Sequence, residues 1–204
     1  MSVLDLSPVI PVVVLDDPDR AVPLARALLA GGVGVLELTL RTPTALESLR
    51  RIAAEVPDVH LGAGTCVRPA DVHAAVGAGA RFVVSPGTTP SLVAAARDAG
   101  VPLLPGVATV SEALQALEMG VSELKFFPAE QSGGAAFLAA LRSPLPGLRF
   151  CPTGGVTAAN APDYLALGNV GCVGGSWLTP DDAVRAGDFD RVRDLAAAAA
   201  GLRG

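Results

Sequence analysis

One short pattern recurs along the chain: a glycine, then a small or apolar residue, then a run of apolar residues that is short enough for a single strand. It occurs at Gly32, Gly79, Gly100, Gly120 and Gly168. A glycine directly after a helix can adopt the left-handed conformation that caps it, so each occurrence predicts that a helix ends and a strand begins. The pattern therefore predicts regular alternation of helices and strands.

Eight apolar runs fit this alternation, at residues 9–15, 33–40, 59–63, 82–85, 103–106, 124–127, 148–151 and 170–174. Segments rich in Ala and Leu lie between them, and several begin with helix-start signals: Thr42-Pro43, Thr89-Pro90, Thr109 with Glu112, and Thr179-Pro180. Strict alternation leaves an open doubly wound sheet or a closed barrel, and eight units favour the barrel. We predict an α/β fold, a (β/α)8 TIM barrel, with residues 1–204 as one domain.

The composition limits the class of partner. Half of the 204 residues are apolar and 17% are charged, which suits a compact domain and excludes a disordered chain. The net charge of -5, without a run of Lys or Arg, argues against a nucleic-acid partner. Residues 9–15 are too few to cross a membrane and lack the basic flank of a signal peptide, so we expect a cytoplasmic protein. A small molecule is the expected partner.

No metal site is expected either. The three cysteines, Cys66, Cys151 and Cys172, are odd in number and far apart, and with the two histidines they form no recognisable ligand spacing. We expect the cysteines to serve as small core residues and assign no role to His60 or His73.

The second predicted strand, VLELTLRT, carries polar residues on one face only. Glu37 and Arg41 fall on that face, and the leucines between them fall on the other. Catalytic groups of a barrel lie at the carboxyl ends of its strands, so the polar face is expected to point inward. Burial of an unpaired carboxylate is strongly unfavourable, so Glu37 either serves catalysis or forms a structural ion pair with Arg41 or Lys125.

The sixth predicted strand, ELKFFPAE, shows the same alternation, with Lys125 and Phe127 on one face. Burial among aromatic rings near a second cation disfavours the charged form of a lysine, which frees its amine to attack a carbonyl. The alternative is a lysine at the strand end that extends into solvent. Because Glu37 and Lys125 both point inward by independent patterns, we favour a nucleophile with an acid/base partner.

Glycine pairs follow the last two predicted strands, in PTGGVT and GGSW. Paired glycines let backbone N–H groups approach an anion, and these two loops are where barrels commonly hold a phosphate. Each motif alone also fits a simple tight turn, but two on neighbouring strands favour a phosphate site. Thr65 in GAGT fits either a substrate contact or a helix-entry turn, and Pro86 in SPG fits a turn.

Taken together, these segments resemble the KDPG aldolases, which cleave 2-dehydro-3-deoxy-6-phosphogluconate. The segments VLELTLRT, GAGT, SPG, PGVAT, ELKFFPAE, RFCPTGG and GGSW occur in the family's order and at its spacing, from about residue 11 to residue 190. The resemblance implies that Lys125 is the Schiff-base lysine, Glu37 the general acid/base and Arg41 the group that binds the substrate carboxylate. It further implies pocket contacts to the pyruvyl portion from Thr65, Pro86 and Phe127, a contact from Thr153 that affects preference, and a phosphate cradle of Gly154, Gly155, Gly175 and Ser176.

The implied reaction is that of a lyase, a class I aldolase that forms pyruvate and glyceraldehyde 3-phosphate in sugar-acid catabolism of the Entner–Doudoroff type. Such an enzyme uses neither a metal nor a cofactor, because the imine takes the role of a metal. Two alternatives remain open: the same chemistry on 4-hydroxy-2-oxoglutarate or the galactonate epimer, and a non-catalytic phosphate-binding barrel. The inward-pointing Glu37 and Lys125 argue against the non-catalytic barrel.

The resemblance also bears on assembly and on the beginning of the chain. The family is usually trimeric, so a homotrimer is expected. Many relatives carry a longer N-terminal helix that plugs the base of the barrel, whereas residues 1–7 leave room for little more than a turn. The beginning of the chain therefore departs from the family, and the packing at the barrel base is the part that the resemblance does not predict.

Overall fold

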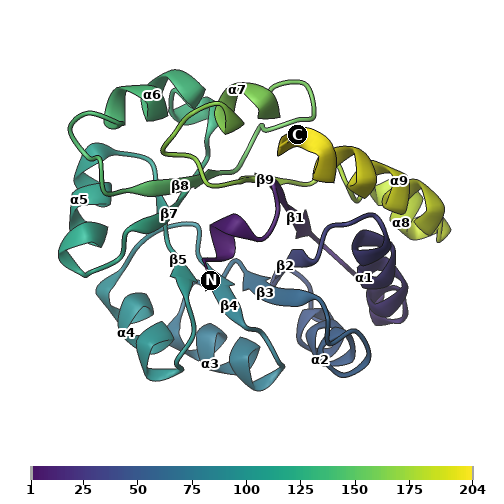
Figure 1. Ribbon diagram of the computed structural model, residues 1–204. Helices are drawn as coiled ribbons and strands as arrows, with labels where there is room; N and C mark the ends of the chain where they lie inside the picture. Colours follow the sequence, from purple (N-terminus) through teal and green to yellow (C-terminus); the bar gives the residue numbers. More distant parts are fainter. Residues whose placement is uncertain (1, 204) are drawn as a thin grey trace.

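Strands and helices alternate through almost the whole chain in the computed structural model, which describes residues 2–203 (Figure 1). The strands are β1 (Val9–Val13), β2 (Val35–Thr39), β3 (His60–Gly64), β4 (Phe82–Val84), β5 (Leu103–Leu104), β6 (Gly106–Val107), β7 (Glu123–Phe126), β8 (Arg149–Pro152) and β9 (Val173–Gly175). The α-helices are α1 (Ala21–Ala30), α2 (Ala45–Glu55), α3 (Pro69–Gly77), α4 (Pro90–Asp98), α5 (Val110–Glu118), α6 (Gly134–Leu141), α7 (Ala161–Leu165), α8 (Asp181–Ala186) and α9 (Phe189–Ala200). Short 3-10 helices are η1 (Val3–Asp5), η2 (Pro18–Arg20), η3 (Glu130–Ser132) and η4 (Gly201–Arg203).

All paired strands are parallel, and the sheet is curled with the helices outside it (Figure 1). Six strands follow the order β5-β4-β3-β2-β1-β9, and three more follow the order β6-β7-β8. Single bridges from Phe150 to Val170 and from Thr153 to Gly174 join β8 to the segment that contains β9. The prediction of a parallel α/β fold is confirmed, because the short βα units place every strand in the same direction.

Two of the predicted strands differ from those observed. The run 103–106 is divided at Pro105 into β5 and β6, since proline has no N–H to donate to a neighbouring strand. The run 170–174 becomes a strand only from Val173 onward. Before that point the chain packs against the N-terminal segment: a Cβ added to Gly171 would lie 2.6 Å from Cβ of Leu4.

Most of the predicted helix boundaries follow local chemistry. Thr109 and Glu112 form the expected capping box at the start of α5, with the Glu112 N–H donating to Thr109 Oγ1 over 3.2 Å. The expected start at Thr42 is wrong, because the Thr42 hydroxyl instead donates to the carbonyl oxygen of Leu15 over 2.7 Å and α2 begins later.

The recurring glycines also behave largely as expected. Gly32, Gly79, Gly100 and Gly120 have the positive φ of a helix-ending glycine. Gly168 does not have a positive φ. After α7 the turn is closed instead by the N–H of Leu167, which donates to the carbonyl oxygen of Tyr164.

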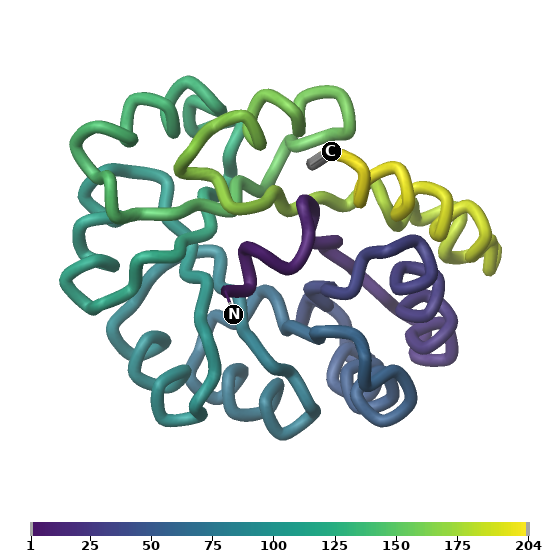
Figure 2. Tube along the Cα trace, in the orientation of Figure 1, coloured from purple at the N-terminus to yellow at the C-terminus, as the bar shows by residue number. Residues whose placement is uncertain are grey.

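The N-terminal segment crosses the middle of the curled sheet at the amino ends of the strands (Figure 2). Val3 and Leu4 of η1 are 3% and 0% exposed. Ser2 Oγ donates to Glu123 Oε1 over 2.6 Å, which holds η1 to the beginning of β7. This short segment therefore fills the base of the sheet, the region that the family resemblance left unpredicted. None of the helices within residues 2–203 combines the length and the apolar composition that a bilayer crossing requires.

Candidate active site

A buried ion pair joins β7 to β2. Nζ of Lys125 lies 3.3 Å from Oε1 of Glu37, and the two side chains are only 5% and 4% exposed. The alternation predicted for both strands is confirmed: Phe126, next to Lys125, points to the helix layer, where its ring stacks on Phe137 of α6 at a centroid distance of 5.2 Å. Lys125 therefore does not extend into solvent, and Glu37 pairs with it.

Two glycines allow close packing around this pair. A Cβ added to Gly64 would lie 2.0 Å from Oε1 of Glu37, so the carboxylate rests directly on the backbone of β3. Gly106 pairs in register with Lys125, and a Cβ there would lie 2.2 Å from the carbonyl oxygen of Pro86. The SPG turn thus packs against the strand beside Lys125, and Pro86 itself is exposed at the end of β4.

Phe127 and Thr65 bring further predicted residues to the same end of the sheet. The ring of Phe127 has its centroid 5.3 Å from Nζ of Lys125. Thr65 accepts a hydrogen bond from Nε of Arg41 over 3.0 Å. Thr65 has a φ of 62°, which is costly for a β-branched residue, and the N-cap of α3 is Arg68, three residues later. The unusual backbone of Thr65 and the hydrogen bond from Arg41 fix the position of its hydroxyl group. This favours a substrate contact at Thr65 over a simple helix-entry turn.

A cavity of about 330 Å³ opens at the carboxyl ends of the strands. Seven of the predicted site residues line it: Arg41, Phe127, Thr153, Gly154, Gly155, Gly175 and Ser176. The remaining four do not line it. Lys125 contacts the lining residue Phe127 and Thr65 contacts the lining residue Arg41, whereas Glu37 and Pro86 lie behind them, Glu37 against Lys125 and Pro86 against Gly106. Arg41 and the glycine loops, which are far apart in sequence, thus share one cavity.

The two glycine loops meet at this cavity in conformations that need glycine. Gly154 and Gly155 have φ values of 99° and 78°. A Cβ added to Gly175 would lie 1.8 Å from Cζ3 of Trp177. Within residues 2–203, the N–H groups of Gly155 and Ser176 donate to no protein acceptor. Backbone N–H groups left open beside a cavity are suited to bind an anion.

The sequence patterns missed three residues that support or line this region. Glu130 lies under the first glycine loop, where a Cβ added to Gly155 would be 2.5 Å from Cγ of Glu130. The hydroxyl of Tyr164 donates to Oε1 of Glu130, and burial, together with this contact, raises the pKa of Tyr164. Asp181, at the start of α8, lines the cavity. Strand alternation could not find any of them, because all three lie outside the strands.

The cysteines behave as core residues, as expected. Cys66, Cys151 and Cys172 are buried and form no disulfide. Burial raises the pKa of the Cys66 thiol to about 12, with smaller contributions from the charges of Asp71 and Glu37. No cluster of three His, Cys, Asp or Glu side chains within residues 2–203 is arranged to hold a metal ion.

The arrangement allows a defined chemistry. A buried amine in hydrogen-bond contact with a carboxylate can act as a nucleophile while the carboxylate accepts and returns protons. The neighbouring cavity has a guanidinium at Arg41 and open N–H groups in the glycine loops, so it can hold a ligand with two anionic groups.

Comparison with known proteins agrees with this chemistry. The family model described as KDPG and KHG aldolase matches residues 1–195. The KHG/KDPG aldolase of Escherichia coli (strain K12) is 51% identical over 195 residues, which cover 96% of this chain and 92% of that protein. The 2-dehydro-3-deoxy-phosphogluconate aldolase of Pseudomonas aeruginosa is 49% identical over 187 residues, which cover 92% of this chain and 85% of that protein.

Two solved structures are similar over nearly their whole length. The KDPG aldolase of Legionella pneumophila, with pyruvate captured as a covalent carbinolamine intermediate, superposes with a TM-score of 0.95 at 45% identity and covers 97% of this chain and 96% of its own. The corresponding Zymomonas mobilis enzyme with 3-phosphoglycerate gives a TM-score of 0.93 at 43% identity, covering 98% of this chain and 94% of its own. This chain belongs to the KDPG and KHG aldolase family.

Proposed function

We propose that this chain is a class I aldolase that cleaves 2-dehydro-3-deoxy-6-phosphogluconate into pyruvate and glyceraldehyde 3-phosphate. The observation that carries the proposal is the buried contact of 3.3 Å between Nζ of Lys125 and Oε1 of Glu37, next to Phe127, which lines the cavity. The relative in which pyruvate is bound as a carbinolamine supports the same covalent chemistry here.

In the proposed mechanism the amine of Lys125 attacks the C2 ketone of the substrate. Glu37 assists the loss of water, and the resulting protonated imine can accept an electron pair. Glu37 then takes the proton of the C4 hydroxyl, directly or through a water, and the C3–C4 bond breaks. Glyceraldehyde 3-phosphate leaves, the enamine is protonated at C3, and hydrolysis releases pyruvate and Lys125. Because the imine stabilises the developing charge, the reaction needs no metal ion or cofactor.

The remaining site residues position the two ends of the substrate. Arg41 holds the carboxylate, while Thr65, Pro86 and Phe127 surround the pyruvyl portion. The phosphate binds to Gly154, Gly155, Gly175 and Ser176, and Thr153 contacts the substrate between the two ends. The shared cavity and the open N–H groups of Gly155 and Ser176 support this orientation.

The same chemistry on 4-hydroxy-2-oxoglutarate is the second candidate, since the Escherichia coli relative carries both substrate names. The galactonate epimer differs only in the configuration of a hydroxyl-bearing carbon and remains a further alternative. A non-catalytic phosphate-binding barrel is disfavoured, because simple anion binding does not require the buried Lys125–Glu37 pair.

The fold and the assembly complete the proposal. The two parts of the sheet form one closed (β/α)8 barrel, and the bridges that join β8 to the β9 segment support this closure. Residues 1–204 form one domain. Three chains form a homotrimer in the cytoplasm. An exposed apolar stripe on α5 supports self-association: Val110, Leu114 and Leu117 are 41%, 43% and 42% exposed.

Borohydride reduction in the presence of pyruvate tests the central proposal. Reduction of the imine should attach a pyruvate-derived group to Lys125 permanently and abolish cleavage, and peptide mass mapping should place the added mass on that residue. Lys125→Met, which keeps an unbranched side chain of similar size, should take up no label. Labelling of another residue, or full activity after reduction, would contradict the mechanism.

A further inference from the structure

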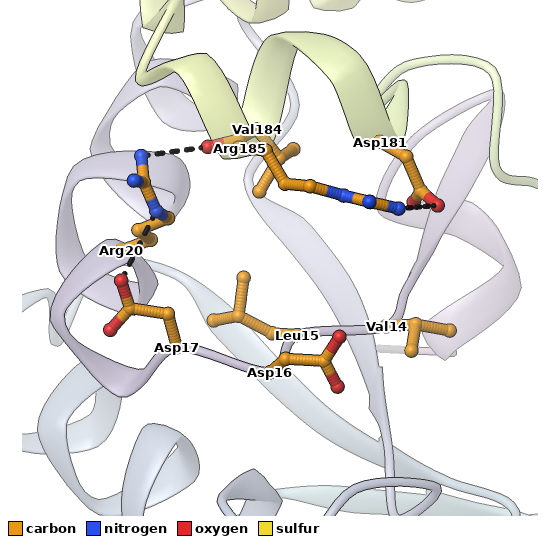
Figure 3. Close-up of a pocket in the computed structure, with 8 residues that line it drawn as sticks. All are labelled: Val14, Leu15, Asp16, Asp17, Arg20, Asp181, Val184 and Arg185. Carbon is orange, nitrogen blue, oxygen red and sulfur yellow. Dashed lines mark hydrogen bonds and ion pairs between the residues drawn. The ribbon is translucent and has the colours of Figure 1, made fainter.

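A carboxylate lines the same cavity as the glycine loops. Asp181 lines the 330 Å³ cavity together with Gly175 and Ser176. A second cavity of about 210 Å³ lies beside the first and shares Val14 and Asp181 with it (Figure 3). Asp181 therefore lies on the boundary between the two cavities, and a ligand held by the glycine loops would share a cavity with its carboxylate.

Arg185, one turn further along α8, partly neutralises that charge. Nη2 of Arg185 lies 3.0 Å from Oδ2 of Asp181, and the Arg185 side chain extends along the helix toward the carboxylate (Figure 3). The two side chains are 78% and 76% exposed. Such exposed pairs are weak and screened, so part of the negative charge of Asp181 stays effective.

The charges that line the larger cavity are few. Among the described residues that line it, only Arg41 and Asp181 carry a charge. In the proposed function Arg41 holds the substrate carboxylate, so the phosphate end has open N–H groups and the Ser176 hydroxyl but no lining cation. A phosphate dianion at that end is repelled by Asp181, whereas an uncharged hydroxyl is not.

We infer that Asp181 is a specificity-determining residue, and that its pairing with Arg185 sets how strongly the pocket favours a phosphorylated substrate over its unphosphorylated counterpart. The inference rests on the proposed function, because it needs an anion in the glycine loops. Asp181 lowers the affinity for the dianion, and Arg185 limits that loss by holding the carboxylate.

The test compares kcat/KM for 2-keto-3-deoxy-6-phosphogluconate with kcat/KM for 2-keto-3-deoxygluconate. Asp181→Asn should raise the ratio of the two values by about 3- to 10-fold, the size expected for one screened charge near a dianion. Arg185→Gln should lower the ratio by about 2- to 5-fold, because the carboxylate loses its partner. Adding Arg185→Gln to Asp181→Asn should change nothing further, since no charge is left to neutralise.

Asp182 offers a matched control in the same turn of α8. It is 71% exposed in its side chain and pairs with Arg191 at 2.7 Å, but it does not line the cavity. Asp182→Asn removes the same charge and should leave the ratio unchanged. The effect of Asp181→Asn should also shrink in about 0.5 M salt, where charges further apart than a few ångströms are screened.

Trp177 supplies a readout that does not depend on catalysis. It is the single tryptophan of the chain, and its ring packs against Gly175 in the proposed phosphate cradle. Titration of inorganic phosphate, followed by Trp177 fluorescence, should give a lower Kd for Asp181→Asn than for the wild type and an unchanged Kd for Asp182→Asn.

The outcomes separate this inference from the proposed function. Equal phosphate Kd values and equal ratios for wild type and Asp181→Asn would overturn the inference alone. A fall in the ratio for Arg185→Gln that persists beside Asp181→Asn would overturn the role of Arg185, since it would then bind the anion itself. A wild type that binds no phosphate, although borohydride still traps pyruvate on Lys125, would overturn the inference and the phosphate site but not the aldolase chemistry.

Discussion

Glu37 is held by two contacts of different kinds. Its carboxylate pairs with Lys125 and lies against the backbone of β3 at Gly64, where no side chain larger than hydrogen fits. A glutamine has the same shape, so it should occupy the same space. Substitution of this residue therefore separates the proton-transfer role of the carboxylate from its packing role.

We expect Glu37→Gln to lower kcat by about 10²- to 10⁴-fold, the usual contribution of a positioned acid/base. Borohydride should still trap pyruvate on Lys125, because the variant keeps the nucleophile. The measurement is steady-state cleavage beside the mass of the trapped protein. Glu118→Gln, an exposed change at the end of α5, serves as the control and should leave both unchanged. Unaltered cleavage by Glu37→Gln would make the Lys125–Glu37 pair structural.

At the scale of elements, the turn after the lysine strand supports the phosphate loop. The N–H groups of Ala129 and Glu130 donate to the carbonyl oxygens of Thr153 and Gly154 over 2.8 and 3.1 Å. The Glu130 side chain lies under Gly155 and is held by the hydroxyl of Tyr164 from α7. The strand that carries Lys125 and the loop proposed to hold phosphate are therefore joined through η3. This connection fixes the distance between the proposed Schiff-base lysine and the proposed phosphate site.

Tyr164→Phe keeps the buried ring and removes only the hydroxyl that holds Glu130. We expect the free energy of unfolding to fall by about 0.5–1.5 kcal/mol, the net contribution of one hydrogen bond, because Glu130 is exposed and water can solvate its carboxylate once the hydroxyl is gone. If Glu130 positions the glycine loop, KM for the phosphorylated substrate should rise while kinetics on the unphosphorylated substrate stay close to those of the wild type. Chemical denaturation and kinetics on both substrates measure the two effects. Equal losses on both substrates would restrict Tyr164 to a role in stability.

At the scale of the whole molecule, a single chain leaves an apolar stripe on α5 exposed. Val110, Leu114 and Leu117 recur at helical spacing on one face, which is typical of a surface that another chain covers. The proposed homotrimer would bury such a stripe between copies of the chain.

Light scattering coupled to size exclusion should give a mass about three times the 20.5 kDa of one chain. Leu114→Glu places a charge within the stripe and should shift the protein toward the monomer, because burial of an unpaired charge in an interface is strongly unfavourable. Gln115→Glu adds the same charge next to the stripe, on an exposed position, and should leave the mass unchanged. A monomeric wild type would contradict the trimer, and a Leu114→Glu protein of unchanged mass would place the interface elsewhere.

Local properties of the chain were sufficient to predict the parallel α/β fold, the inward-pointing Glu37 and Lys125, and the glycines that end α1, α3, α4 and α5. Side-chain alternation in a strand and the positive φ of a glycine depend on a few neighbouring residues, so both can be inferred from short segments. Pro105, which divides the fifth predicted strand, is a local signal as well. It lies within an apolar run that resembles one continuous strand, so the division was not predicted.

Contacts between distant segments were decided only by the tertiary structure. Lys125 and Glu37 are 88 residues apart, and their separation of 3.3 Å depends on how the whole sheet curls. The contact of Tyr164 with Glu130 and the place of Asp181 in the cavity depend on how α7 and α8 pack at the end of the sheet. No short-range periodicity encodes such distances, because they result from the summed geometry of many packed elements. The sequence by itself thus determined which residues face inward, and the tertiary structure determined which of them meet.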